Sequence, residues 1–274
     1  QTLEDFNDFK YFEVNGVPFG KMALSTFSRQ RASGIQNIED DRSKEEILFW
    51  LEDLVSWYTI AEEIVARFKI TDAFFTEVFM EEYGSFYYAC LKAKVNVLRF
   101  AGTVRDDAIV VQRLTEKNDR THFSSLSSRS WSSISDRKIS TAVDEELANN
   151  FSDRYSDKWA LSYRNHPHTQ LASRNQMRSH FNIASDMKVA VIYSHILYDT
   201  LFFNGDDVFD NYADWLVETV RAACDNTSIR WFLKIHPSNL WRGELEYFHG
   251  GIYEEVRIIA ENIGELPEHV SYIF

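Results

Sequence analysis

The chain has 274 residues, with 29 basic and 42 acidic side chains and a net charge of −13 when histidine is counted as neutral. This length allows one large domain or two of ordinary size, each with a real hydrophobic core. Because a polyanion is bound by clustered Lys and Arg, the acidic balance and the lack of a basic run argue against a DNA or RNA partner.

The sequence shows no apolar run long enough to span a bilayer, and its start, QTLEDFNDFK, lacks a signal-peptide pattern. Its two cysteines, Cys90 and Cys224, lie far apart in predicted apolar helix faces, which is typical of buried reduced thiols. We therefore expect a cytoplasmic protein without a metal cluster, for which peripheral contact with the inner membrane stays open.

The first predicted elements are a turn and a long helix. Asn15-Gly16 lies between two short apolar stretches and favours a hairpin-like entry. Ser43 with Glu46 reads as a capping box at the start of a helix. The residues that then repeat at helical spacing and predict one buried stripe are Ile47, Leu51, Leu54, Tyr58, Ala61 and Val65.

A strand-helix-strand unit is predicted over residues 70–100. A short apolar strand precedes a loop at Glu81 to Gly84, a helix carries Tyr87 and Leu91, and a second strand runs from Val95 to Phe100. Such a unit implies parallel strands joined by a right-handed crossover. Residues 108–114, AIVVQRL, are typical of one more strand.

Serine dominates residues 122–140, where the apolar period is lost, so we predict a mobile loop. Two interpretations stay open for this loop, a lid over a cleft and an inert surface segment. Leu147, Phe151, Tyr155 and Trp159 lie four apart and predict that a helix resumes before the hinge-like HPHTQ.

From Met187 onward, strands near Val189, Ile229 and Val270 alternate with helices, which predicts two successive βαβ crossovers of a doubly wound sheet. We therefore expect an α/β protein with a first domain over residues 1–180 and a second over 186–274. Because a sheet of this kind normally has more strands, we expect the second domain to be truncated.

Polar side chains follow two of these strands, at the edge where open parallel sheets bind ligands. The first strand is followed by Ser194, His195 and Asp199, and the second runs into Lys234, His236, Ser238 and Asn239. Pro237 stops the second strand and a helix cap follows, so an imidazole, an ammonium and a helix N-terminus are predicted to meet. An anion such as a nucleotide phosphate would fit there; alternatively, His236 bonds a backbone carbonyl and Lys234 is solvated.

Residues 191–242 resemble the donor-binding half of bacterial capsular-polysaccharide biosynthesis proteins, glycosyltransferases of the GT-B architecture that include Kdo-transferring enzymes. Residues 12–29 and 81–100 are more loosely similar to the N-terminal half of that family. The elements that carry the main resemblance are Ser194-His195 with Asp199, Asp214-Trp215-Leu216, Glu218-Thr219, and Lys234 with His236-Pro237.

The resemblance implies two Rossmann-like domains with parallel sheets. It implies a nucleotide-activated sugar, with CMP-Kdo as the candidate, as a substrate in place of a cofactor. A glycan or glycolipid acceptor would bind the first domain, and His236 would contact the donor phosphate. Two alternatives stay open: a CDP-polyol phosphotransferase of the teichoic-acid type, and a non-catalytic nucleotide- or glycan-binding module of the same fold.

Transfer by such an enzyme needs positive groups for the leaving phosphate and a base for the acceptor hydroxyl, and in principle no metal. Lys234 and His236 suit the first task, and Glu81 or Glu82 is the candidate base. His166 and His168 fit no zinc spacing, and Trp241 is the tryptophan best placed to serve as a sugar platform. No GxGxxG, Walker or GxSxG motif occurs, so dehydrogenase, NTPase and hydrolase functions are not indicated.

Overall fold

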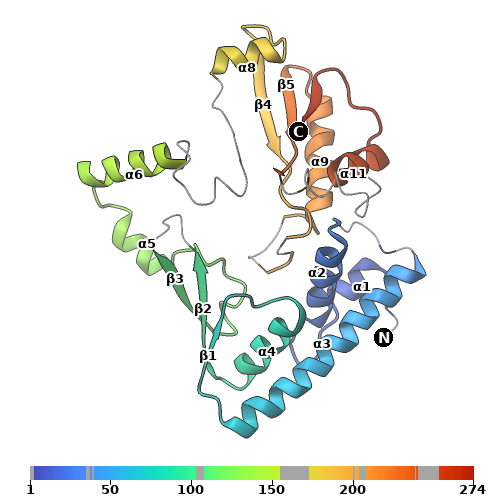
Figure 1. Cartoon of the computed structure of the whole chain (residues 1–274), viewed down its shortest axis with the longest axis vertical. Helices are drawn as coiled ribbons and strands as arrows, with labels where there is room; N and C mark the ends of the chain where they lie inside the picture. The colour runs from blue at the N-terminus through green and yellow to red at the C-terminus, as the bar shows by residue number, and fades with distance from the viewer. Residues whose placement is uncertain are drawn as a thin grey trace.

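The computed structural model describes residues 3–34, 38, 40–102, 108–154, 173–199, 201–203, 208–237, 239 and 253–274, and only the backbone of Glu81, Glu82, Asp153 and Arg154. We call residues 3–114 the first lobe and residues 188–274 the second lobe. Figure 1 shows the two lobes one above the other, each built around its own small sheet. The chain is therefore an α/β protein, as the sequence predicts.

The first lobe surrounds a sheet of three strands with helices. Its elements in chain order are α1 (Phe6–Lys10), α2 (Phe19–Arg31), α3 (Asp41–Phe68), β1 (Asp72–Phe75), α4 (Glu81–Lys92), β2 (Asn96–Gly102) and β3 (Ile109–Leu114). The long α3 runs beneath α2 and α4 (Figure 1) and packs against both.

The apolar stripe of α3 is buried as predicted from its spacing, from Ile47 to Val65. The cap differs from the prediction, because the carboxylate of Asp40 accepts the N–H of Ser43 at 2.8 Å. Glu46 instead forms an ion pair with Arg31 at 2.6 Å. The predicted capping box is therefore wrong: the helix begins three residues earlier, and the carboxylate of Asp40 accepts the backbone N–H of Ser43.

The βαβ unit is confirmed, since β1 and β2 are parallel and paired from Asp72–Asn96 onward. The predicted loop at Glu81 to Gly84 is wrong, because these residues form the first turn of α4. β3 runs antiparallel to β2, so this sheet is mixed and does not have the all-parallel form expected for a Rossmann-like domain.

The turn at Asn15-Gly16 is confirmed by positive φ angles of 54° and 71° and by a single bridge between Val14 and Val17. No hairpin strand follows it, because residues 19–31 form α2. Their side chains are mostly unbranched helix formers, which do not favour an extended chain.

The serine-rich segment is helical in its middle part. α5 spans Ser128–Ile134 and is capped by Ser127, whose hydroxyl accepts the N–H of Ser130 at 3.1 Å. α6 follows at Thr141–Arg154, and side chains are exposed along residues 124–152. The prediction of a continuous loop over residues 122–140 is thus wrong for α5, whose hydroxyls cap a helix start.

The second lobe contains a parallel sheet in the order β4-β5-β6, preceded by α8 (Arg174–His180). Its elements are β4 (Lys188–Tyr193), α9 (Tyr212–Asp225), β5 (Ile229–Lys234), α11 (Glu254–Asn262) and β6 (Val270–Ile273), which confirms both predicted βαβ crossovers. The helices α9 and α11 pack together over one face, around Leu216, Leu233 and Ile258.

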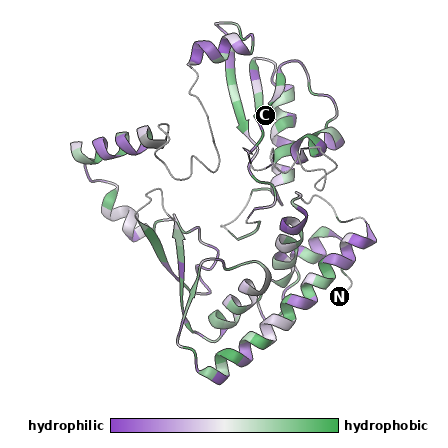
Figure 2. Ribbon diagram, viewed as in Figure 1, coloured by the Kyte–Doolittle hydropathy of each residue, from purple (hydrophilic) through white to green (hydrophobic). Residues whose placement is uncertain are grey.

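The opposite face of β4 is open to solvent in the described part of the chain. Val189 and Val191 are 41% exposed and Tyr193 is 72% exposed. Figure 2 shows this strand as a hydrophobic green arrow beside the mostly purple α8. A doubly wound sheet would have a layer of helices over this face as well; among the described residues Phe181, just after α8, packs on Phe232 of β5 at 4.7 Å and leaves β4 uncovered.

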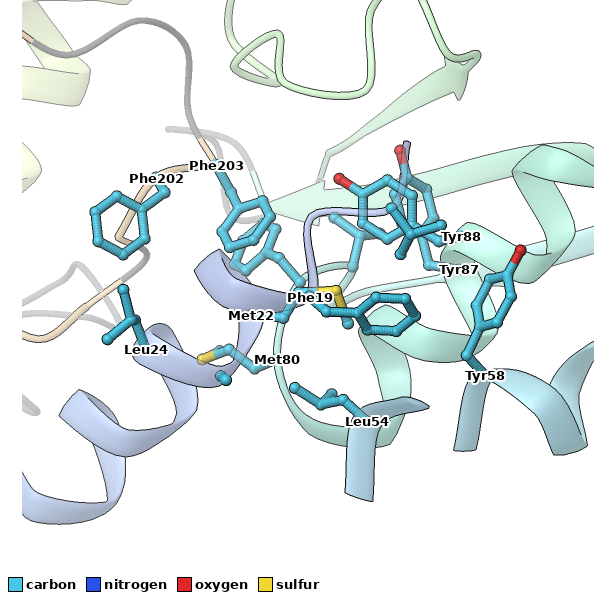
Figure 3. Close-up of a cluster of buried hydrophobic side chains, with 14 of the residues drawn as sticks. Phe19, Met22, Leu24, Leu54, Tyr58, Met80, Tyr87, Tyr88, Phe202 and Phe203 are labelled. Carbon is cyan, nitrogen blue, oxygen red and sulfur yellow. The ribbon is translucent and has the colours of Figure 1, made fainter. Parts of the chain in front are cut away.

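The segment after β4 crosses from the second lobe into the core of the first. Leu201, Phe202 and Phe203 are each less than 5% exposed and belong to the first lobe's hydrophobic cluster (Figure 3). The ring of Phe203 stacks on Phe79 at 5.0 Å, and the Ser25 hydroxyl donates to the Leu201 carbonyl at 3.0 Å. Residues within the predicted second domain thus complete the first core.

Polar contacts also join the lobes. They are Lys10 Nζ to Asp210 Oδ1 (2.6 Å), Arg29 Nη1 to Asp199 Oδ1 (3.1 Å) and Ser33 Oγ to Glu254 Oε1 (2.6 Å).

Of the two free cysteines, Cys90 is buried in α4 and burial raises its pKa to about 11, while Cys224 is half-buried in α9. None of the helices in the described ranges is both long and apolar enough to cross a membrane.

Gly20 is predicted to be indispensable, because a Cβ atom there would lie 1.6 Å from the Phe9 carbonyl oxygen. Backbone cannot yield as a flexible side chain does, so Gly20→Ala should lower the free energy of unfolding by about 3 kcal/mol or more. Gly102→Ala is the matched control, since nothing lies within 4 Å of its Cβ position, and it should change stability by less than about 1 kcal/mol. Chemical denaturation of both variants measures the difference, and equal stabilities would contradict the packing of α1 on α2.

Candidate functional site

The carboxyl ends of β4 and β5 lie side by side at one edge of the parallel sheet. The Ser194 N–H donates to the Lys234 carbonyl at 3.1 Å, and the His236 N–H donates to the Ser194 hydroxyl at 3.1 Å. These bonds extend the pairing beyond the last residues of both strands. The edge at which open α/β sheets bind ligands is therefore held in a defined shape.

A fully buried carboxylate, Glu255 in the first turn of α11, organises this edge. Its Oε1 accepts from the Ser194 hydroxyl and from the Asn239 amide, each at 2.6 Å. Burial raises the pKa of Glu255, and the hydrogen bonds from Ser194 and Asn239 oppose that rise. Two of the residues predicted to bind a phosphate thus donate to a carboxyl group of the protein itself.

The other predicted residues occupy different surroundings. Lys234 is half-buried, and burial lowers its pKa. Asp199 forms its ion pair with Arg29 across the lobes. His236 is half-buried and its N–H is bonded to Ser194.

Several predicted residues cannot be placed as site groups. Glu81 and Glu82 begin α4, and nothing further is described of their side chains. Ser238, His166, His168 and Trp241 lie outside the described residues.

His195, also predicted, lines a pocket of about 580 Å³ at the carboxyl end of β4. Its ring lies 4.6 Å from that of Tyr212, the first residue of α9, and its Nδ1 is 2.9 Å from the Ile196 carbonyl. The described residues that line this pocket, called the aromatic pocket below, are Tyr193, His195, Leu201, Phe202, Val208, Phe209, Asp210, Asn211, Tyr212 and Trp215.

Two residues of the aromatic pocket have backbone in the left-handed region. The φ angle is 60° at His195 and 70° at Phe202. A bulky residue such as phenylalanine is rarely found there, and each such residue costs on the order of 1–3 kcal/mol. The surrounding contacts hold both residues in place: Phe202 is anchored in the first core and His195 rests on Tyr212.

The aromatic pocket can bind a planar or ring-shaped group with a negative charge nearby. Five of its ten lining residues are aromatic, which suits stacking of a base or a sugar. α9 begins at its wall, where the Asn211 side chain accepts the Asp214 N–H at 2.8 Å, so a positive helix end lies beside the imidazole. Within the described ranges, no group of three His, Cys, Asp or Glu side chains is placed to hold a metal ion.

Sequence reasoning missed Phe202, Asp210 and Tyr212 as site residues. A signal for Asp210 and Tyr212 was present, since they flank Asn211 at the start of the helix that follows the chosen strand. Such helix starts lie at the binding edge of a parallel sheet. No local pattern could have identified Phe202, because its place depends on the core of the other lobe.

No protein-family model, no curated protein and no solved structure matches this chain. Its fold is that of an α/β protein, with a pocket at the carboxyl edge of a parallel sheet. Function is therefore inferred from the geometry of the chain itself.

The buried carboxylate leads to a prediction about pH. Because the folded-state pKa of Glu255 is raised, the folded protein holds this proton more tightly than the unfolded chain does. The contribution of Glu255 to the free energy of unfolding is fully present at low pH and is lost as pH rises through its raised pKa. Glu255→Gln keeps an oxygen acceptor for Ser194 and Asn239 and should remove this loss.

Urea denaturation from pH 4 to pH 8 measures the effect. The free energy of unfolding of Glu255→Gln relative to wild type should increase as pH rises. Glu265→Gln, at an exposed site, is the control and should show no such trend. A constant difference between Glu255→Gln and wild type across this range would contradict the prediction.

Proposed function

We propose that this chain is a GT-B-like glycosyltransferase of two α/β lobes that takes a sugar from a nucleotide-activated donor. CMP-Kdo is the candidate donor, and a capsular or surface polysaccharide built at the cytoplasmic face of the inner membrane is the candidate product. The observation that carries this proposal is the aromatic pocket at the carboxyl edge of β4, which lies against the first lobe through Phe202.

The donor's ring system would stack in the aromatic pocket, between the walls that hold Tyr212 and Trp215. Its phosphate would face His195 and the start of α9. Lys234 supports this arrangement, because it pairs in register with Tyr193, a residue of the pocket wall. The resemblance assigns the phosphate instead to His236, which is bonded to the neighbouring Ser194.

In the proposed reaction, an acceptor hydroxyl oxygen bonds to the anomeric carbon while the bond from that carbon to the phosphate oxygen breaks. The phosphate oxygen keeps the electron pair, and the nucleotide leaves as an anion beside positive groups, so that a metal ion is not required. The hydroxyl proton passes to a carboxylate. Among the described residues of the pocket wall, Asp210 carries the carboxylate, and we assign it this role; Glu81 and Glu82 stay a prediction.

Nucleotide binding tests the donor site. A thermal-shift screen with CMP, CDP, UDP and GDP should show stabilisation by a cytidine nucleotide. His195→Ala should weaken that binding by roughly tenfold or more, because a charge-assisted hydrogen bond and a stacking partner are lost. His180→Ala, at an exposed site on α8, should bind as wild type does.

The same screen with His236→Ala separates the two assignments. Weakening by His195→Ala alone places the phosphate in the aromatic pocket, and weakening by both variants supports the resemblance as well. If neither variant binds more weakly than wild type, or no nucleotide binds, the proposed donor site is wrong.

Asp210→Asn tests the transfer step, and an unchanged melting temperature shows that loss of its ion pair with Lys10 leaves the lobes in place. The variant should leave CMP affinity within about threefold of wild type while slowing release of CMP from CMP-Kdo by roughly a hundredfold or more, as loss of a general base does. Chromatography of the released nucleotide measures the rate. A wild-type protein that binds CMP but releases none, with or without glycan acceptors, would be the non-catalytic module, and release of polyol phosphate from a CDP-polyol would indicate the phosphotransferase.

A further inference from the structure

A second pocket, of about 430 Å³, lies beside the aromatic pocket. Three cationic side chains line it from three separate elements: Lys10 at the end of α1, Lys21 in α2, and Arg120 in the turn region after β3. We call it the cationic pocket. Two carboxylates, Asp210 and Asp214, line it from the second lobe.

The cationic pocket has more positive than negative side chains, although the molecule as a whole is acidic. The chain carries 29 basic and 42 acidic residues, whereas this pocket gathers three cations and two carboxylates. One cation is fixed in place, because Lys10 Nζ lies 2.6 Å from Asp210 Oδ1 and its side chain is only 10% exposed. Asp210 and Asp214 offset two of these three charges, so the lining keeps an excess of one positive charge, and an anion is the kind of ligand that such an excess attracts.

The two pockets adjoin along a shared wall. Phe202, Val208, Phe209 and Asp210 line both of them. A group bound among the cations would therefore lie directly across this wall from a ring bound in the aromatic pocket. Two ligands that react with one another need such neighbouring sites.

We propose that the cationic pocket binds the phosphate group of a small-molecule ligand. Phosphate is favoured over carboxylate because cations from three directions suit a tetrahedral dianion, whereas one arginine fork satisfies a planar carboxylate. If the proposed transferase function holds, on which this step rests, the ligand is a phosphorylated acceptor whose hydroxyl meets the donor at Asp210.

Titration calorimetry with inorganic pyrophosphate in metal-free buffer of low ionic strength tests the cationic pocket alone. Wild type should bind pyrophosphate, and the affinity should fall as salt is added. Lys21→Met and Arg120→Met should each weaken binding by about tenfold, and the double variant should weaken it further. Lys10 is left unchanged, because its pair with Asp210 joins the lobes.

Matched variants separate charge from folding. Arg137→Met with Lys138→Met removes the same two charges from exposed positions between α5 and α6 and should leave pyrophosphate binding unchanged. Lys21→Arg keeps the charge and should retain binding. Equal melting temperatures among the variants show that the fold is intact.

Pyrophosphate that does not bind wild type, or that binds the Lys21/Arg120 double variant equally well, overturns the proposal. Binding that is lost equally in the Arg137/Lys138 variant is a general charge effect and also overturns it. The donor proposal can fail by itself. If His195→Ala leaves CMP binding unchanged while pyrophosphate binding still depends on Lys21 and Arg120, the cationic pocket is supported and the transferase is not.

Discussion

The segment that leaves β4 is held by both lobes at once, and the shape of the site depends on this. At its beginning, Ser194 is bonded to the buried Glu255 of the second lobe. At its end, Phe202 and Phe203 are buried in the core of the first. Burying two phenylalanine side chains contributes on the order of 3–6 kcal/mol, far more than an exposed ion pair between lobes. Hydrophobic burial therefore anchors the pocket wall, and the ion pairs add orientation.

The same crossing explains why a pocket forms beside β4. Among the described residues after β5, Asn239 donates to Glu255, so its amide is bonded to an internal carboxyl group. The chain after β4 instead travels outward to the other lobe and leaves space between itself and the start of α9. His195 lies in that space, with its ring against Tyr212. An imidazole at a pocket wall is available for a ligand in a way that groups bonded to a buried carboxylate are not.

Charge is distributed unevenly across the shared wall of the two pockets. Asp210 lies on this wall, between an aromatic side and a cationic side, and forms an ion pair with Lys10. A carboxylate in such a position can accept a proton from a hydroxyl presented on one side while the developing charge is stabilised on the other. The proposed transfer and the proposed phosphate site thus share one wall, which lines the aromatic pocket on one side and the cationic pocket on the other.

Local periodicity and turn chemistry were sufficient to predict the α/β class, the buried stripe of α3, the turn at Asn15-Gly16 and the order of strands and helices from β4 to β6. Each of these depends on residues a few positions apart, so the spacing of apolar side chains carries the information. Errors arose where neighbouring groups compete for one role. Asp40 outcompetes Ser43 as the cap of α3, and Ser127 starts a helix inside a segment whose composition indicated a loop.

Tertiary structure alone decided which of the polar residues after the strands line the aromatic pocket. Ser194, His195 and Asn239 look equivalent in the sequence, since each follows a strand. Glu255, sixteen residues beyond Asn239, makes them different. A buried carboxylate must be hydrogen-bonded, and Ser194 and Asn239 donate to it, whereas His195 does not. The burial of Phe202, and with it the pocket wall, depends on a core that residues more than a hundred positions earlier build, and no local pattern reports a contact at that distance.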